Sequence, residues 1–294
     1  MRYKEVVRCV NEILSQYSMP LTLRQIFYRL VANYNYPNKN STYAQLSKQL
    51  VKAREKGDID EDRIEDRSRE FLGEDNGFNS LEEFLKYQIT AFLDSPKYYS
   101  RNMWTEQPEF VIVWVEKDAL SRVIFNIAEK YNVITAPSRG YSSYTYIKKA
   151  IERFPNDKEV TILHFADHDP SGLDMTRDVN ERFNSYSSRE IKIERIALSY
   201  DQVQRYNLTL NPTKRADPRA EDYISKFGDR CWELDAIEPN ELQRMVEESI
   251  VRHIDEKIWN DTVEKREQER QEIEKIFLKI RKIFQKIGCF RFNF

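Results

Sequence analysis

The sequence has little cysteine and little glycine. Its three cysteines, Cys9, Cys231 and Cys289, are far apart and form no C-x-x-C pair, which argues against a disulfide framework and against a zinc site. None of the seven glycines belongs to a G-x-x-x-x-G-K-[ST] loop, and no other phosphate-cradling loop stands out. Any ATP-driven activity would therefore depend on a separate subunit.

Long apolar runs are also missing. No stretch of about eighteen apolar residues occurs, and the N-terminal segment MRYKEVVRCVNEIL mixes charged and apolar residues, unlike a signal peptide. The composition of 294 residues, 40% hydrophobic and 13% aromatic, is typical of a folded chain long enough for two domains. We therefore expect a soluble, cytoplasmic protein with no membrane contact.

Charge is unevenly distributed along the chain, although the net charge is only −2. Residues 1–56 carry ten lysines and arginines against three acids, whereas residues 57–83 carry eleven acids against three arginines. A basic N-terminal module is a common feature of proteins that bind polyanions.

Three short helices are predicted in this basic module. Apolar residues recur at helical spacing from Tyr3 to Tyr17, Thr22 can cap a second helix, and a third helix runs from about Ser41 to Gly57. A polar face on the third helix is typical of a helix-turn-helix or winged-helix unit, but a small bundle with a solvated face fits the composition equally well. The side chains that we expect to contact DNA are Lys48, Gln49, Lys52, Arg54 and, further along the chain, Arg139.

The pattern changes after residues 73–108, which are predicted to be a linker with one helix over LEEFLKYQITAFL. The apolar runs FVIVWV, NVITA, VTILHF and IKIERIAL then alternate with helical segments. This alternation predicts an α/β domain with a parallel sheet between helices, whose sites lie at the carboxyl ends of the strands. The expected domains are 1–72 and 109–260, followed by a C-terminal helical extension over 261–294.

Three carboxylates follow two of these expected strands. Glu116 comes after FVIVWV, and Asp167 and Asp169 come after VTILHFA, so all three should meet at one edge of the sheet. Residues two apart in an extended segment point the same way, so both aspartates can face one cation. Carboxylates are ligands that Mg²⁺ prefers, and phosphoryl transfer is a usual role for such a site. Solvated acids at strand ends are the alternative, but three acids together favour a Mg²⁺ site.

These motifs resemble known families. VEKDAL and ADHDPSGL are similar to the Toprim domain, which occurs in primases, topoisomerases and nucleases. TLRQIFYRL resembles the tyrosine motif in the winged-helix (CAP-like) domain of the A subunit of DNA topoisomerase VI and its meiotic double-strand-break relatives. SRGYSS, ALSYDQVQRYNL and WELDAI follow in that family's order, so the similarity covers roughly residues 20–260 and is greatest to short, stand-alone A-subunit-like proteins.

The resemblance implies roles for individual residues. Tyr28 would be the nucleophile, Arg24 a cation that stabilises the phosphate, and Glu116, Asp167 and Asp169 the Mg²⁺ ligands. The chemistry is compatible, because a tyrosine with a pKa of about 10 needs a nearby cation to become a good nucleophile at neutral pH. Without the resemblance, Tyr28 would be interpreted as a core tyrosine, one of seventeen in the chain.

The expected function is Mg²⁺-dependent cleavage of duplex DNA by tyrosine transesterification, as in a type IIB topoisomerase A subunit. The alternatives are a hydrolytic Toprim nuclease and a DNA-binding or assembly protein without turnover. His168, between the two aspartates, either fills space, contacts a phosphate or acts as a proton carrier. The resemblance further implies a nucleoid-associated homodimer, with a separate B-type ATPase as a possible partner and with Tyr28 of one chain reaching the carboxylates of the other.

Two segments are candidate contacts between the subunits of such a dimer. One is the aromatic-rich segment KYYSRNMW, and the other is the stripe of isoleucine and phenylalanine residues within 273–287. Both segments could equally belong to the internal core of one chain.

Overall fold

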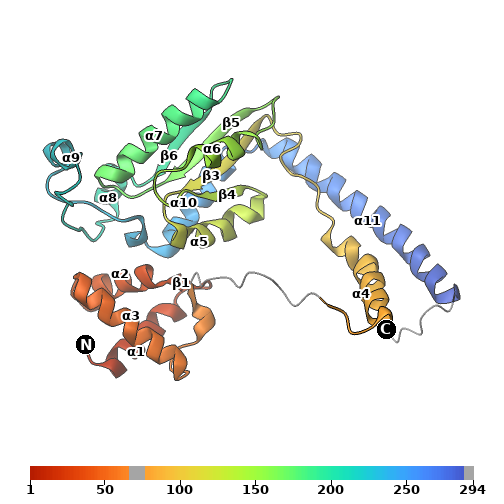
Figure 1. Ribbon diagram of the computed structural model, residues 1–294, viewed down its shortest axis with the longest axis horizontal. Helices are drawn as coiled ribbons and strands as arrows, with labels where there is room; N and C mark the ends of the chain where they lie inside the picture. The colour runs from red at the N-terminus through yellow and green to blue at the C-terminus, as the bar shows by residue number, and fades with distance from the viewer. Residues whose placement is uncertain (66–76, 288–294) are drawn as a thin grey trace. The chain divides into compact units, whose positions relative to one another are not determined.

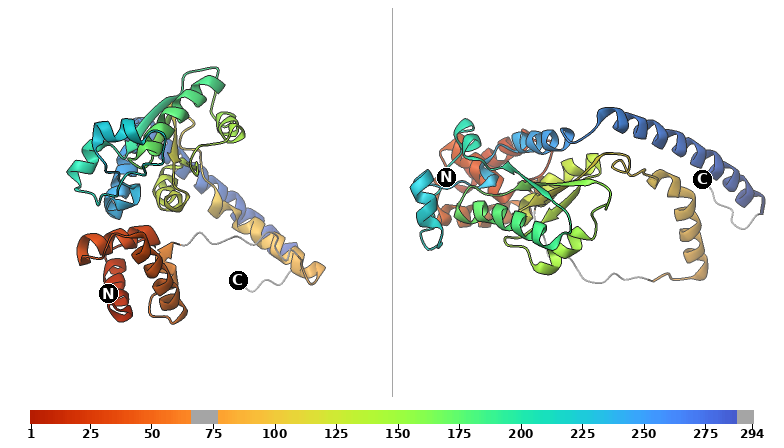
Figure 2. Two further views of the ribbon diagram at one scale, coloured as in Figure 1. Left: turned by 60° about the vertical axis from the view of Figure 1, so that its left-hand side comes forward. Right: turned by 90° about the horizontal axis from the view of Figure 1, so that it is seen from above.

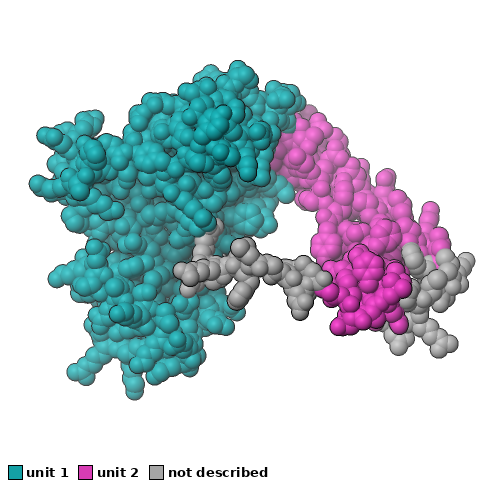
Figure 3. All heavy atoms as spheres, in the orientation of Figure 1, with its two compact units in different colours: residues 1–67, 108–253 teal, residues 68–107, 254–294 magenta. Residues whose placement is uncertain are grey.

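The computed structural model describes residues 1–65 and 77–287, with side chains described as far as residue 283. The chain divides into two compact units (Figure 3). Unit 1 comprises Met1–Arg67 and Pro108–His253, and unit 2 comprises Ser68–Gln107 and Ile254–Phe294. Cys9 and Cys231 are free and buried, and Cys289 lies outside the described residues.

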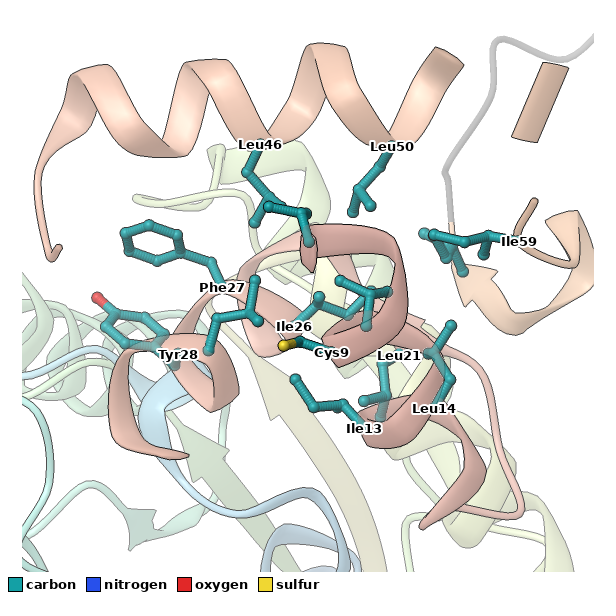
Figure 4. Close-up of a cluster of buried hydrophobic side chains, with 14 of the residues drawn as sticks. Cys9, Ile13, Leu14, Leu21, Ile26, Phe27, Tyr28, Leu46, Leu50 and Ile59 are labelled. Carbon is teal, nitrogen blue, oxygen red and sulfur yellow. The ribbon is translucent and has the colours of Figure 1, made fainter. Parts of the chain in front are cut away.

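The N-terminal part of unit 1 is a module of three helices, as predicted (Figure 1). Its elements are α1 (Tyr3–Ser15), β1 (Leu21–Thr22), α2 (Leu23–Tyr34), α3 (Asn40–Glu55), η1 (Glu61–Arg63) and β2 (Ile64–Glu65). Thr22 caps α2, since its side chain accepts a hydrogen bond of 3.2 Å from the backbone N–H of Gln25. Apolar faces of the three helices meet in a common core (Figure 4).

A winged helix is not confirmed for this module. Within residues 1–65, which the structure describes, the strands β1 and β2 are two residues long and pair in parallel. A hairpin wing would need antiparallel strands, so the module is described here as a three-helix unit with a short parallel pair.

The rest of unit 1 is a parallel sheet between helices, as predicted (Figures 1 and 2). Its strands are β3 (Glu109–Val115), β4 (Ile134–Pro137), β5 (Glu159–Phe165) and β6 (Lys192–Ala197), in the order β4-β3-β5-β6. The longer helices around it are α5 (Asp118–Ala128), α6 (Tyr144–Ile151), α7 (Pro170–Tyr186) and α10 (Pro239–Val251). Shorter elements are η3 (Glu129–Tyr131), α8 (Tyr200–Arg205), α9 (Ala220–Phe227) and η4 (Leu234–Ala236).

Burial on both faces explains why the central strands are almost entirely apolar. Ile112 and Trp114 of β3 belong to a core with Ile147 of α6 and Phe183 of α7, whereas α5 packs with α10 and contacts β3 and β4. The chain passes from β3 to β4 at one edge and then returns past β3 to β5. The adjoining ends of β3 and β5 are therefore the switch point of the sheet, where such folds have their crevice.

Unit 2 combines the predicted linker and the predicted C-terminal extension. Its elements are α4 (Leu81–Asp94), η2 (Ser95–Tyr98) and α11 (Glu256–Ile287). The rings of Trp104 and Trp259 lie 6.2 Å apart, and Arg101 forms an ion pair of 2.5 Å with Glu269. Segments treated as separate in the sequence thus pack together. Among the described residues, no helix is long and apolar enough to cross a membrane.

Candidate active site

A cleft of about 540 Å³ opens in unit 1 where β3 and β5 end. Glu116, Asp167 and Asp169 line it from the sheet, Arg24 lines it from α2, and Asn211 lines it from the loop after α8. The structure therefore brings the three predicted carboxylates and the predicted arginine together in one chain.

The backbone at the end of β5 holds the carboxylates in place. Glu116 Oε2 accepts a hydrogen bond of 3.0 Å from the backbone N–H of Asp167, and Asp167 Oδ1 accepts one of 2.7 Å from the N–H of Leu234. Asp169 caps α7, with Oδ1 2.6 Å from the backbone nitrogen of Gly172. A Cβ at Gly172 would lie 2.2 Å from the carbonyl oxygen of Asp167, so only glycine fits this close approach.

Burial shifts the proton affinity of Glu116 and of Asp167. Loss of solvent raises the pKa of Glu116, and the negative charge of Asp169 adds to the shift. Burial also raises the pKa of Asp167 to about 7, against the opposing effect of the Lys117 charge. Acids of this kind gain strongly from a nearby cation.

Lys117 supplies such a cation from within the chain. Its Nζ lies 3.0 Å from Asp167 Oδ2, 2.9 Å from Glu233 Oε2 and 2.8 Å from Asp235 Oδ2. Burial opposes the charge of Lys117, but the carboxylates of Asp235, Asp167 and Glu233 hold its pKa well above the usual value. The sequence predicted a cation facing the two aspartates. In the structure, Lys117 places a positive charge beside Asp167, and this lysine was not among the predicted site residues. Its position directly after Glu116, and the two acids of WELDAI, were the available signals.

Arg195 of β6 is a second buried cation that the sequence analysis missed. Its guanidinium donates to the carbonyl oxygens of Asp167 at 2.6 Å, Gly172 at 2.9 Å and Leu198 at 2.9 Å. Burial lowers its pKa to about 10. These bonds tie β6 to the turn that carries the aspartates.

Tyr28 lies behind the cleft rather than in it. The side chain is 1% exposed, and its hydroxyl accepts a hydrogen bond of 2.8 Å from Asn211 Nδ2. Figure 4 shows the hydroxyl turned away from the other labelled side chains of the core. Burial and then the charge of Glu233 raise the pKa of Tyr28, whereas the bond from Asn211 and the charge of Arg24 lower it. The phenol is therefore protonated at neutral pH.

Arg24 lies close to the carboxylates. Its Nε is 3.4 Å from Glu233 Oε2, and its guanidinium lies 4.4 Å from the centre of the Tyr43 ring. Glu233 is thus shared between Arg24 of the helical module and Lys117 of the sheet.

Contacts within one chain hold the helical module to the rest of unit 1. Arg29 donates to the carbonyl oxygen of Ala236 at 2.7 Å, and Asn38 donates to Asn211 Oδ1 at 3.1 Å. The resemblance implied that Tyr28 of one chain reaches the carboxylates of another, and no feature of the sequence joined the two regions within one chain. The structure supplies such contacts within one chain, and a site shared between two chains stays a prediction.

His168 does not line the cleft. It is 2% exposed, its Nδ1 lies 2.7 Å from the hydroxyl of Tyr223, and its ring packs edge-on against Phe227 at 4.8 Å. Burial lowers its pKa to about 4. Of the expected roles, filling space agrees with this buried position, and the contact with a phosphate does not.

The residues predicted to bind DNA differ in exposure. Lys48 and Lys52 are exposed on α3, while Gln49 and Arg54 are half-buried. Arg139 is exposed and pairs with Asp118 at 3.2 Å. The two lysines are therefore the side chains of α3 best placed for phosphate contacts.

The carboxylates do not form a ready-made metal centre. Among the residues that the structure describes, no three His, Cys, Asp or Glu side chains gather as a group able to hold a metal ion. Both oxygens of Asp167 already have partners, the ammonium of Lys117 and the N–H of Leu234. In comparisons with known proteins, no family model matches this chain and no curated protein is significantly similar to it.

Proposed function

We propose that this chain cleaves duplex DNA in a Mg²⁺-dependent reaction in which Tyr28 attacks a backbone phosphate, as in type IIB topoisomerase A subunits. The observation that supports it is the shared cleft: Arg24, the three carboxylates and the partner of Tyr28, Asn211, all line it. Passage of one duplex through another would require a separate ATPase subunit.

In the proposed reaction, the oxygen of Tyr28 bonds to phosphorus, and the bond from phosphorus to one deoxyribose oxygen breaks. The phenol proton passes to water, and the released deoxyribose oxygen takes up a proton from water. The N–H of Asn211 favours this step, because its hydrogen bond lowers the pKa of Tyr28. Tyr28 must move into the cleft, since it is buried in this structure.

Arg24 can take a phosphate without leaving an unpaired acid behind. Its partner Glu233 also binds Lys117 at 2.9 Å, so a phosphate can replace Glu233 at the guanidinium while Glu233 keeps its lysine. A guanidinium aimed at a phosphate stabilises the charge that develops in the transition state.

The donors suit Mg²⁺ in their chemistry, because they are clustered carboxylates, and burial raises the pKa of Glu116 and of Asp167. Glu116 and Asp169 would hold the ion, and Asp167 would join them when Glu233 and Asp235 alone hold Lys117. When bound, Mg²⁺ supplies positive charge beside the phosphate oxygens.

The burial of Tyr28 favours a second candidate, a hydrolytic nuclease in which this tyrosine only packs. The deciding experiment incubates duplex DNA with the protein and Mg²⁺, denatures the mixture and detects DNA joined to protein. We expect an adduct with the wild type and none with Tyr28→Phe. Tyr36→Phe is the matched control, because Tyr36 is another buried tyrosine of the same module.

Two other results of this experiment would identify the two alternative functions. Cleavage that persists in Tyr28→Phe and disappears in Asp167→Asn identifies the hydrolytic nuclease. Salt-sensitive DNA binding without cleavage by any of these proteins, under any divalent metal, identifies a binding or assembly protein.

A further inference from the structure

Unit 2 exposes an unusual amount of apolar surface. Of the eighteen large hydrophobic side chains that are exposed among the described residues, ten belong to this unit. They are Phe78, Leu81, Phe84, Leu85, Tyr87, Phe92, Tyr98, Ile276, Leu278 and Ile283. Clusters of this kind usually mark a surface that another molecule covers.

The first half of α4 has little cover of its own. Residues 81–88 are all exposed, and Leu81 retains 73% of its surface. The helix contacts α11 near its own C-terminal end, where the rings of Phe92 and Phe277 lie 5.1 Å apart and Arg281 donates to the carbonyl oxygen of Leu93. The right-hand view in Figure 2 shows α4 turned away from α11. A helix of 14 residues is only marginally stable in water unless its apolar side chains pack against another element. A partner that covers the first half of α4 would therefore stabilise it.

The two helices carry opposite charges next to their apolar residues. Residues 275–283 of α11 contain Lys275, Lys279, Arg281 and Lys282 and no acid, whereas the exposed start of α4 contains Glu82 and Glu83 with a single lysine. Each chain therefore offers both an acidic apolar helix and a basic apolar helix.

We propose that unit 2 is a self-association surface, in which the exposed half of α4 of one copy packs against residues 275–283 of α11 of a second copy. A groove of about 610 Å³, lined by Leu93, Phe277, Leu278 and Arg281 among others, offers room for apolar side chains of the partner helix. The contact is made twice around a two-fold axis, because each chain supplies both halves. This inference does not depend on the chemistry of the cleft.

The test is sedimentation velocity of the full chain over a range of concentrations, with charge-reversed variants. We expect the wild type to dimerise, and less so at high salt. The double variants Glu82→Lys/Glu83→Lys and Lys279→Glu/Lys282→Glu should each raise the dimer dissociation constant about a hundredfold, because juxtaposed like charges cost several kcal/mol. An equal mixture of the two variants should dimerise again, since both of its contacts pair opposite charges.

Tyr144→Glu is the control, because Tyr144 is an exposed aromatic of unit 1. It should dimerise like the wild type. A wild type that stays monomeric at every concentration overturns the proposal, as does a dimer that survives both charge reversals. Binding of a monomeric wild type to phosphatidylserine vesicles also overturns it and assigns the surface to a membrane.

Discussion

The carboxylate edge of the sheet and the helical module both contribute to one cleft, but they place their side chains by different means. At the edge, Glu116 and Asp167 follow parallel strands that pair at Val115 and Phe165, so topology alone sets them side by side. In the module, Tyr28 is placed by packing and remains 1% exposed, with its hydroxyl bound to another residue. Glu116 and Asp167 line the cleft, whereas Tyr28, the proposed nucleophile, lies behind its surface.

The largest expected effect tests the carboxylate edge. Asp167→Asn removes a charge with little change of shape, and we expect the rate of DNA cleavage to fall about a thousandfold, as when other charge-stabilising groups are removed. Glu159→Gln, at the exposed opposite end of β5, is the control and should cleave normally. The measurement is the initial rate of plasmid nicking. Equal rates for the two variants would show that the edge is not the reactive part of the cleft.

The next effect concerns the internal cation. Lys117→Met leaves Asp167, Glu233 and Asp235 without their shared partner, so we expect unfolding to cost about 3 to 5 kcal/mol less. Urea unfolding measures this, with Lys130→Met as an exposed control that should match the wild type. Added Mg²⁺ should restore part of the loss if the edge binds metal. A variant as stable as the wild type would contradict the role given to Lys117.

The stability of the edge should also depend on pH. Burial raises the pKa of Asp167 to about 7, above its value of about 3.9 in an unfolded chain. Its contribution to stability is therefore complete below about pH 4 and is lost as the pH rises through about 7. Measured without metal, the unfolding free energy of the wild type should therefore fall by about 2 to 4 kcal/mol relative to that of Asp167→Asn as the pH rises over this range. A difference that is constant with pH would argue against this shift.

A smaller effect is expected at Gly172. An alanine there would press on the carbonyl group of Asp167, so we expect a loss of about 1 to 3 kcal/mol of stability together with slower cleavage. Gly77→Ala is the control, because no atom lies within 4 Å of its added Cβ. Chemical denaturation and the nicking assay together show whether the turn tolerates a side chain. If Gly172→Ala is as stable and as active as the wild type, the close approach of Gly172 to Asp167 does not constrain the carboxylates.

The smallest effect tests the module. Lys48→Ala removes one exposed charge from α3, and we expect DNA binding to weaken modestly, with the slope of log K against log salt falling by about 0.9. Fluorescence anisotropy with duplex DNA at several salt concentrations measures the slope. Lys130→Ala, exposed at η3, is the control. An unchanged slope for Lys48→Ala would remove α3 from the DNA-binding surface.

The sequence predicted the features that depend on local pattern. The parallel sheet and the meeting of Glu116 with Asp167 follow from strand-helix alternation and from the common polarity of parallel strands. Lys117 could not be assigned its role, because its partners Glu233 and Asp235 lie more than a hundred residues further along the chain. The interpretation of Tyr28 as a core tyrosine agrees with its burial, whereas its contact with Asn211 depends on tertiary packing.

The same distance in sequence explains the difference in domain organisation. Unit 2 forms through pairs such as Arg101 with Glu269, which connect the predicted linker with the predicted extension. Neither segment carries a local signal for the other. Helix α4 itself was predicted from its apolar spacing and is confirmed.

Asp167 uses all of its polar groups, and each bond reaches a different part of the fold. Its N–H binds Glu116, its carbonyl oxygen binds Arg195, and its two carboxylate oxygens bind the N–H of Leu234 and the ammonium of Lys117. Substitutions at such a junction are not additive, because all four partners contact the same residue and a change in one can shift it against the others. During divergence, these positions are therefore constrained to change together or not at all, which makes the junction an evolutionary unit although its residues are scattered along the chain.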